Sequence, residues 1–383
     1  MPVLGDSGLR VAHIISNLGA GGAEGSLYRL IKAIPDGSGQ HTVITFKSGG
    51  VNAGLLRQHG VAVHELGTKT SVGGIWHLPG LARTLRDFRP DVVQGWMYHG
   101  NVAASLSQRF MPQPAKVCWN VRQTSSRLRD DKLLTQPLIL AGAPLSKFCS
   151  QIIYNSCLSA RQHERYGYAS TKRRVIHNGV DCDEFKPDPG SHARLCDLLK
   201  VPSGSRLIGR IGRKAKMKDH ETMFRAFAEL ARNPLNHLVL IGQGMDRLDS
   251  ELANWATGTG APSRVHFLGG RSNIADLMPG LDVNVSSSST SEGFPNVIAE
   301  GMACGVPAVA TDVGESLLIL SDPDRIVPPG EPAALADRIS RVLAMPEENR
   351  TLLGRRDRNR MLQLFSISKA VQAYHETWTD CLA

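Results

Sequence analysis

The chain has 383 residues, of which 42% are hydrophobic and 21% charged, with a formal net charge of +9. This length allows two domains of ordinary size, and the even spread of glycine and proline excludes a low-complexity or collagen-like chain. The seven scattered cysteines form no C-x-x-C pair, which favours a reduced, cytoplasmic compartment and argues against a structural zinc site.

Neither a signal peptide nor a membrane-spanning segment is expected. The N-terminus MPVLGDSGLR lacks the charged-then-apolar layout of a secretory signal. The apolar, uncharged stretch at residues 133–146 is too short to span a bilayer.

Charge is unevenly distributed along the chain. Residues 1–175 hold 21 Lys and Arg against 9 Asp and Glu, a net +12, whereas residues 176–383 hold 23 against 26, a net −3. This asymmetry predicts an acidic partner for the first half, either an anionic membrane face or a pyrophosphate-bearing acceptor. Nucleic acid is disfavoured, because no basic run is interleaved with aromatic residues and no recognition motif appears. The alternative is a basic surface that binds no ligand.

Short apolar strands alternate with helical segments in the first half of the chain. Such alternation predicts an α/β fold with a parallel, doubly wound sheet. The expected strands are 11–15, 42–46, 62–65, 91–94, 116–120, 151–155 and 174–176, and the expected helices include 23–33, 77–88 and 159–166.

Prolines and glycines between residues 187 and 204 predict a stretch rich in loops, and a second alternation follows it. We therefore predict a first domain at 1–185, a second domain at 186–362 and a C-terminal helix within 363–383. Ligands of open parallel sheets bind at the carboxyl ends of strands, so sites are expected there. The expected elements of the second domain are strands 207–211, 237–241, 265–267 and 283–285 and a helix at 220–231.

Two glutamates, Glu292 and Glu300, lie eight residues apart in TSEGFPNVIAEGMACGVPAVATDVG. The segment predicts a loop, a helix over 296–303, a turn containing Gly305 and a buried strand from 308. A helix N-terminus attracts anions, so two carboxylates beside it suit a ligand that has both hydroxyls and phosphates. The alternative is a helix-capping Glu292 and a solvent-facing Glu300.

The E-x7-E pattern with GFPNVIAE and GVPAVATDVG resembles the retaining, GT-B-type glycosyltransferases of family four, of the bacterial cell-surface polysaccharide kind. The resemblance implies two Rossmann-like domains facing across a cleft and a C-terminal helix that crosses back to the first domain. It also implies that the second domain binds a nucleotide sugar.

The segment after strand 207–211 is similar to the diphosphate clamp of that family. Arg213 can grip phosphate oxygens with its planar guanidinium, and Lys218 adds a point charge. Cations there would stabilise the negative charge that develops as a nucleoside diphosphate departs. The neighbouring Lys214 and Lys216 are expected to be solvated.

Gly21 and Gly22 belong to a Gly-rich turn that resembles the GGAE loop of the family. A nicotinamide-binding turn would need an acidic residue at the end of the second strand. That strand ends with Thr45, Phe46 and Lys47, so an oxidoreductase is disfavoured.

The remaining family positions concern the acceptor side. His99 and Asn101 form a His-x-Asn that follows strand 91–94, and packing of His99 in the wall is the alternative. After strand 116–120, many family members carry a histidine credited with contacting the donor sugar, whereas this chain has Arg122 and Gln123. No role is transferred from that histidine, and Arg122 is instead a candidate for binding an acceptor phosphate.

The resemblance therefore implies three groups of site residues. The catalytic group is Glu292, Lys218, Arg213 and His99. The acceptor group is His99, Asn101 and Arg122. The donor-binding group is Gly21, Gly22, Arg213, Lys218, Gly242, Leu268, Gly293, Phe294, Pro295, Asn296, Val297 and Glu300.

The resemblance implies a retaining glycosyltransferase that moves a sugar from a UDP- or GDP-type donor to a glycan acceptor, which we expect to be linked to a lipid diphosphate. No cofactor or essential metal is expected, because Arg213, Lys218 and the helix N-terminus supply the positive field. The expected location is the cytoplasm, peripheral to the inner face of the plasma membrane. The alternatives are a transferase acting on a soluble acceptor and a non-catalytic subunit that binds nucleotide sugars.

Overall fold

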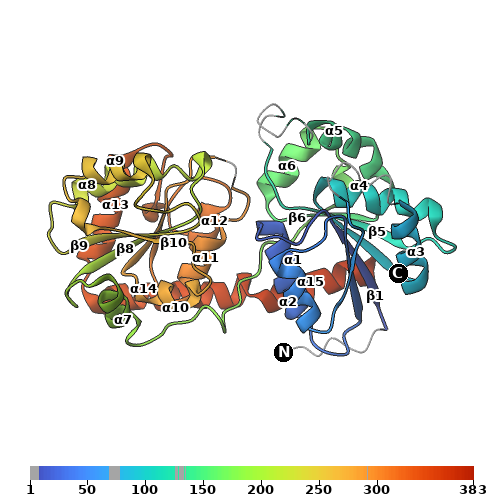
Figure 1. Cartoon of the computed structure of the whole chain (residues 1–383), viewed down its shortest axis with the longest axis horizontal. Coiled ribbons are helices and arrows are strands. Elements are labelled where there is room, and N and C mark those ends of the chain that lie inside the picture. Colours follow the sequence, from blue (N-terminus) through green and yellow to red (C-terminus); the bar gives the residue numbers. More distant parts are fainter. Residues whose placement is uncertain (1–7, 69–77, 126–127, 129–132, 134, 291) are drawn as a thin grey trace. The chain divides into compact units, whose positions relative to one another are not determined.

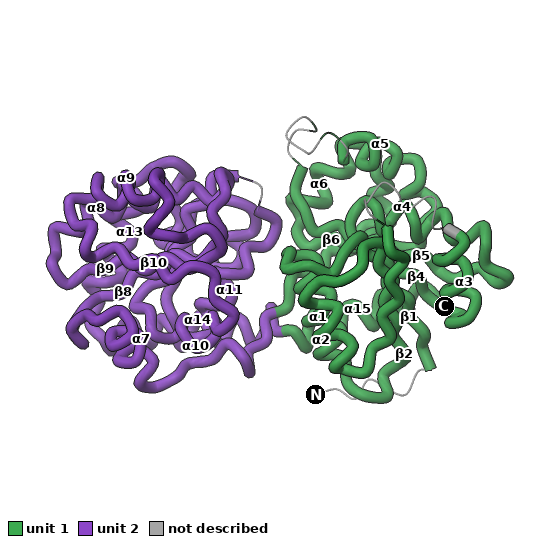
Figure 2. The backbone as a smooth tube through the Cα atoms, in the orientation of Figure 1, with its two compact units in different colours: residues 1–179, 367–383 green, residues 180–366 purple. Residues whose placement is uncertain are grey.

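The computed structural model describes residues 8–68, 78–125, 128, 133, 135–290 and 292–383. The chain divides into two compact units, which Figure 2 colours separately. Unit 1 comprises residues 1–179 and 367–383, and unit 2 comprises residues 180–366. These divisions lie within a few residues of the predicted boundaries at 185 and 362.

A parallel sheet forms the centre of unit 1, which confirms the predicted fold class. Its strand order is β3-β2-β1-β4-β5-β6-β7, so the winding direction of the chain reverses between β1 and β4. The strands are β1 (Arg10–Ile15), β2 (Gln40–Thr45), β3 (Ala62–Glu65), β4 (Val92–Trp96), β5 (Lys116–Val121), β6 (Gln151–Tyr154) and β7 (Arg173–Val175).

Helices cover both faces of this sheet, because side chains alternate along each strand. In β1, Val11 and Ile15 join the core beneath α1, α2 and α15, whereas Ala12 and Ile14 join the core beneath α3, α4 and α5. Figure 1 shows these layers. The helices are α1 (Gly22–Lys32), α2 (Val51–Gln58), α3 (Leu78–Phe88), α4 (Met97–Ser107), α5 (Gln136–Leu145), α6 (Cys157–Arg165) and α15 (Ile367–Asp380).

The C-terminal helix α15 is part of the core of unit 1. Tyr374 and Trp378 are nearly fully buried, and the Trp378 indole N–H donates to Gln94 Oε1 at 2.9 Å. Their burial contributes about 1.5–3 kcal/mol for each side chain, so α15 is held on the sheet by packing rather than by a loose tether.

Unit 2 is built on a second parallel sheet, again as predicted. Its strand order is β10-β9-β8-β11-β12-β13, and the winding direction reverses between β8 and β11. The strands are β8 (Arg206–Ile211), β9 (Asn236–Ile241), β10 (Val265–Gly269), β11 (Val283–Ser286), β12 (Ala308–Thr311) and β13 (Ile326–Val327).

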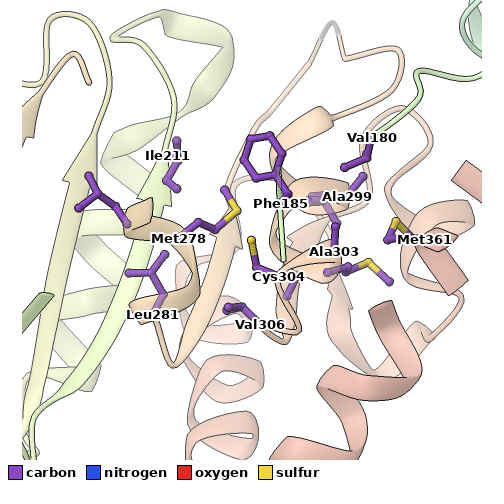
Figure 3. Packing of buried hydrophobic residues seen from close by; sticks show 14 of the residues in the cluster. Val180, Phe185, Ile211, Met278, Leu281, Ala299, Ala303, Cys304, Val306 and Met361 are labelled. Atoms are coloured by element: carbon purple, nitrogen blue, oxygen red, sulfur yellow. The ribbon is translucent and has the colours of Figure 1, made fainter. Parts of the chain in front are cut away.

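Two apolar clusters lie on the two faces of this second sheet. The first contains side chains of α7, α10, α11 and α12, and the second contains those of α8, α9 and α13. Figure 3 shows part of the first cluster, where Ala299 and Ala303 of α11 lie beside Phe185. The helices are α7 (Ser191–Leu199), α8 (His220–Leu230), α9 (Ser250–Gly258), α10 (Ile274–Leu277), α11 (Asn296–Ala303), α12 (Ser316–Leu320), α13 (Pro332–Ala344) and α14 (Glu347–Arg360).

One local prediction is wrong. The stretch between residues 187 and 204, predicted to be rich in loops, contains helix α7, which is stabilised by burial of Leu195 and Cys196. After the strand predicted at 91–94, β4 extends to Trp96 and α4 begins at Met97. Within the described part of the chain, no helix combines the length and apolar composition that crossing a bilayer requires.

Candidate active site

The candidate site of unit 2 lies where the winding of its sheet reverses. β8 and β11 are neighbours there, and the two loops that follow their carboxyl ends span residues 212–219 and 287–295. A backbone hydrogen bond from Ser289 to Met217, 2.9 Å long, joins the two loops. Ligands of open parallel sheets bind at such a switch point, so these loops are the first place to look for chemistry.

Arg210 anchors the first of these loops from beneath. Its fully buried guanidinium donates to Ser287 Oγ at 3.0 Å and to the carbonyl oxygens of Ile211 and Lys218 at 2.9 and 2.6 Å. Burial lowers its pKa to about 10, and the negative charge of Glu292 opposes that shift. Arg210 thus fixes the backbone of Lys218 and adds positive charge below the site.

The predicted catalytic residues Lys218 and Glu292 are in direct contact. The Lys218 ammonium donates to Glu292 Oε1, and the same oxygen accepts a hydrogen bond of 3.0 Å from Ser288 Oγ. The side chains of Lys218 and Glu292 are only 18% and 13% exposed. The switch point therefore carries an ion pair that is mostly buried but keeps some exposure to solvent.

Gly314 fixes the backbone of the Glu292 loop. Its φ of +64° belongs to the left-handed region, and an added Cβ would lie 2.5 Å from the Glu292 carbonyl oxygen. The Glu315 N–H donates to the Gly293 carbonyl at 3.0 Å. The loop after β11 is therefore clamped to the segment after β12, which holds the Glu292 side chain at the switch point.

Helix α11 begins directly after this loop, with the bounds that the sequence predicted. Pro295 stands at its N-cap and makes no side-chain capping bond. Phe294 is buried against Phe365, with ring centroids 5.5 Å apart, which fixes the entry to the helix. Val297 is half-buried beside the core. The start of α11 thus combines backbone N–H donors with the positive end of a helix dipole.

Glu300 lies in the second turn of α11 and is half-buried. Burial raises the pKa of the Cys304 thiol, and the negative charge of Glu300 adds to that shift. Glu300 therefore carries its charge one helical turn from Cys304. The two glutamates of the E-x7-E pattern lie on either side of the helix start.

The other predicted donor residues surround the same edge of the sheet. Gly242 follows β9, and its N–H donates to the carbonyl of Gly269 at the end of β10, 2.8 Å away. Leu268 is half-buried in β10. Arg213 is exposed, and within the described residues its side chain makes no ion pair. Its guanidinium is therefore available to a ligand at this edge.

Lys214 is partly exposed, in line with the prediction of a solvated side chain, but it also forms two surface ion pairs that the sequence did not predict. Its ammonium lies 2.6 Å from Asp249 Oδ2 and 2.8 Å from Glu251 Oε2, at the start of α9. Lys216 is exposed, as expected. Lys214 is thus committed to a structural ion pair, whereas Lys218 of the same loop contacts the candidate catalytic glutamate.

In unit 1 the predicted residues follow β1 and β4, which flank the switch point of the first sheet. Gly21 and Gly22 are exposed at the start of α1. His99 is half-buried in α4, and burial lowers its pKa, with a further contribution from Lys47. Within the described residues, His99 Nε2 is buried and has no hydrogen-bond partner, and the role of His99 in binding a ligand stays a prediction.

Asn101 and Arg122 have structural partners in unit 1. Asn101 is buried and its Oδ1 accepts from the Asn120 N–H at 3.1 Å, so it ties α4 to β5. Arg122 donates to Tyr374 Oη at 2.9 Å and to Asn178 Oδ1. Roles in acceptor binding stay predictions for both residues.

A pocket in unit 1 brings Arg122 together with a second arginine. Arg29 of α1 lines it with Trp96 and His177. Burial lowers the pKa of the Arg122 guanidinium, and the charge of Arg29 acts in the same direction. Within the described residues, neither arginine has a carboxylate in ion-pair contact. The pocket is therefore basic, and Arg29 is a residue that the sequence did not single out.

Comparison with known proteins decides the family. Residues 20–184 match the model described as Glycosyltransferase Family 4, and residues 205–345 match the model described as Glycosyl transferases group 1. The chain belongs to these glycosyltransferases. The family 4 match begins in unit 1 and extends just past its boundary at residue 179, whereas the group 1 match falls within unit 2 and includes the Lys218–Glu292 pair.

Individual relatives agree with this assignment. The glycosyltransferase is 24% identical over 326 residues to a Bacillus subtilis protein named as glycosyltransferase EpsF, and the match covers 79% of each chain. It is 29% identical to a D-inositol 3-phosphate glycosyltransferase of Saccharomonospora viridis, over 61% of this chain and 56% of that relative. The solved structure of Anabaena HepE in complex with UDP has a TM-score of 0.85, at 23% identity over 97% of this chain and 100% of the other. The fold is therefore GT-B.

The described residues bring together no three His, Cys, Asp or Glu side chains that could hold a metal ion. That the reaction needs no essential metal stays a prediction. Arg210, Arg213 and Lys218 supply positive charge at the switch point.

Proposed function

We propose that the protein is a retaining glycosyltransferase that moves a sugar from a UDP- or GDP-type donor to a glycan hydroxyl during assembly of a bacterial surface polysaccharide. The observation that carries the proposal is the Lys218–Glu292 pair at the switch point, beside the start of α11. Complexes of HepE with UDP and with UDP-glucose support a UDP-type donor.

In this proposal the donor diphosphate meets the positive groups of the switch point. Lys218 and Arg213 contact phosphate oxygens, and the backbone N–H groups at the start of α11 add further donors. The diphosphate then competes with Glu292 for the Lys218 ammonium. Glu292 is left to accept hydrogen bonds from sugar hydroxyls, and Glu300 accepts from the ribose.

The transfer step follows from this arrangement of charges. The bond between the sugar C1 and the diphosphate oxygen breaks, and negative charge grows on the departing phosphate next to Lys218 and Arg213. Cations held there stabilise that charge more in the transition state than in the ground state. The acceptor hydroxyl attacks C1 from the face that the diphosphate leaves, and its proton passes to a diphosphate oxygen. The anomeric configuration is retained, and neither a protein nucleophile nor a metal takes part.

We place the acceptor on unit 1 and propose that it is a glycan carried on a lipid diphosphate, used at the cytoplasmic face of the membrane. The net positive charge of the first half of the chain favours an anionic acceptor. Arg122, beside Arg29, and His99 are the residues of unit 1 that we propose for contacts with the acceptor once their side chains rearrange. His99 would orient the acceptor or the donor sugar.

A soluble phosphorylated acceptor is the second candidate. The name of the Saccharomonospora viridis relative states that it acts on D-inositol 3-phosphate, and the net positive charge of the first half of this chain would also favour such an anionic compound. A lipid-diphosphate glycan and a soluble sugar phosphate can be offered in parallel with one donor, and transfer to only the soluble compound would favour this candidate.

The experiment that tests the proposal is a transfer assay with purified protein. Donor sugars are screened first for slow hydrolysis, and the product configuration at C1 is then read by proton NMR. We expect the wild type to form product with the anomeric configuration of the donor retained. We expect Glu292→Gln to lose turnover. Inversion would refute the mechanism, and binding of a donor without any turnover would favour the non-catalytic subunit.

A further inference from the structure

Helix α5 of unit 1 presents an apolar stripe to solvent. The helix carries no charged residue. Its exposed positions are Pro137, Leu140, Ala141 and Pro144, which follow the spacing of one helical face, and Leu140 is 50% exposed. An amphipathic helix of a globular protein normally turns polar side chains outward, so α5 has the reverse pattern on this face.

The stripe continues into Phe148, which is 83% exposed. This exposure does not result from a frayed end, because Ser146 and Cys149 on either side are buried. Ser146 Oγ accepts from the Ala169 N–H at 2.9 Å and donates to the Ala143 carbonyl at 2.7 Å. The turn is thus fixed in a conformation that holds Phe148 outward.

The opposite face of α5 is already used for packing. Ile139 is fully buried, and an added Cβ at Gly142 would lie 2.2 Å from the Tyr168 hydroxyl oxygen. Rotation of the helix to bury the exposed stripe would break this close contact. Pro137, Leu140, Ala141, Pro144 and Phe148 therefore form a permanent apolar patch, which we call the α5 surface.

Positive charge borders the α5 surface. The sequence contains no Asp or Glu from residue 132 to residue 163. Lys147 is exposed next to Phe148. Burial raises the pKa of Cys149 to about 12, and the charge of Lys172 opposes that shift, so a second ammonium lies close to the same turn.

We propose that the α5 surface docks the enzyme on an anionic phospholipid membrane, with α5 lying in the plane of the headgroups and Phe148 inserted below them. Apolar side chains combined with lysines are what an interfacial helix needs, because burial and attraction to anionic lipid add together. A second copy of the chain fits less well, since the same lysines would then face each other. The proposal deepens the acceptor side of the proposed function and rests on it, because docking would bring unit 1 to lipid-linked acceptors.

The test is flotation of the full-length protein with vesicles of phosphatidylglycerol mixed with phosphatidylcholine, compared with vesicles of phosphatidylcholine alone. We expect binding to the anionic vesicles that weakens at high salt. Leu140→Glu combined with Phe148→Glu should reduce the partition coefficient at least about tenfold, and Lys147→Glu alone should reduce it about fivefold or more. Leu248→Glu, at a position 92% exposed in unit 2, is the matched control and should bind as the wild type does.

Hydrolysis of the donor sugar in solution, measured on every variant, reports on folding and on the switch-point site independently of the vesicles. Unchanged vesicle binding by the double variant would overturn the proposal. Failure of the wild type to bind anionic vesicles would also overturn it. The same holds if the wild type binds no vesicles but forms a dimer that the double substitution dissociates. If the wild type does not hydrolyse any donor sugar, that result would instead contradict the proposed reaction.

Discussion

Replacing Lys218 with alanine should slow turnover about 100- to 1,000-fold, equivalent to about 2.7–4 kcal/mol, which is typical for loss of one preorganised charge-stabilising donor. The substitution removes the ammonium that contacts Glu292 Oε1 and that would meet the departing diphosphate. Since Arg213 and the start of α11 remain, the residual rate should stay measurable.

The same substitution should leave the protein folded. The two side chains are 18% and 13% exposed, so the pair is partly hydrated, and Glu292 keeps its hydrogen bond to Ser288 Oγ. Loss of one hydrogen bond to a charged group costs about 1–3 kcal/mol of unfolding free energy. A domain of ordinary stability, with about 5–15 kcal/mol, tolerates that loss.

The assay compares turnover and thermal unfolding of the wild type, Lys218→Ala and Lys214→Ala. Lys214 lies in the same loop but is paired with Asp249 and Glu251, so its variant is a matched control for removing one positive charge. We expect it to retain turnover within about fivefold, the effect of a partly exposed charge. Equal losses in both variants, or a nearly normal rate in Lys218→Ala, would refute the assignment of Lys218.

Three further predictions concern the fold and the loop at the site. Asp357→Asn removes the buried carboxylate that pairs with Arg325 through two hydrogen bonds, so chemical denaturation should show a free energy of unfolding lower by about 3–5 kcal/mol. A decrease below about 1 kcal/mol, as for an exposed ion pair, would contradict this prediction. Gly314→Ala introduces a methyl group 2.5 Å from the carbonyl oxygen of Glu292, so turnover should fall while the melting temperature changes little. Normal turnover would contradict the role of Gly314 in holding the Glu292 loop. Burial lowers the pKa of His163 to about 4 and of His220 to about 3. Because the unfolded state protonates these histidines near pH 6.5, their contribution to the free energy of unfolding should be constant above that pH and fall as the pH drops towards 4. A rise in the free energy of unfolding on acidification would contradict this prediction.

Much of unit 2 near the site could be predicted from local sequence. Helix α11 has the predicted bounds, because Pro295 favours a helix start and Gly305 with Pro307 ends it. The parallel sheets followed from alternation of apolar strands with helical segments. The family resemblance implied that Lys218 and Glu292 belong to one site, but it did not predict their direct contact across 74 residues of chain.

Other features depend on tertiary contacts that local patterns do not encode. Helix α7 was missed because prolines and glycines flank it, whereas burial of Leu195 and Cys196 stabilises it. Arg210 gave only a weak signal, a charged residue within an apolar strand, since its partner Ser287 is 77 residues away. The ion pairs of Lys214 join it to a distant helix start in the same way.

The most direct test of the central claim is a titration of the purified protein with UDP-, GDP-, ADP- and CDP-sugars, following both binding heat and slow hydrolysis, in the wild type and in Lys218→Ala. The account predicts that at least one donor binds the wild type and is slowly hydrolysed, and that Lys218→Ala loses hydrolysis and binds the donor more weakly. Failure of every donor to bind the wild type, or binding and hydrolysis that are indifferent to Lys218, would contradict the claim that the switch point of unit 2 holds the donor diphosphate.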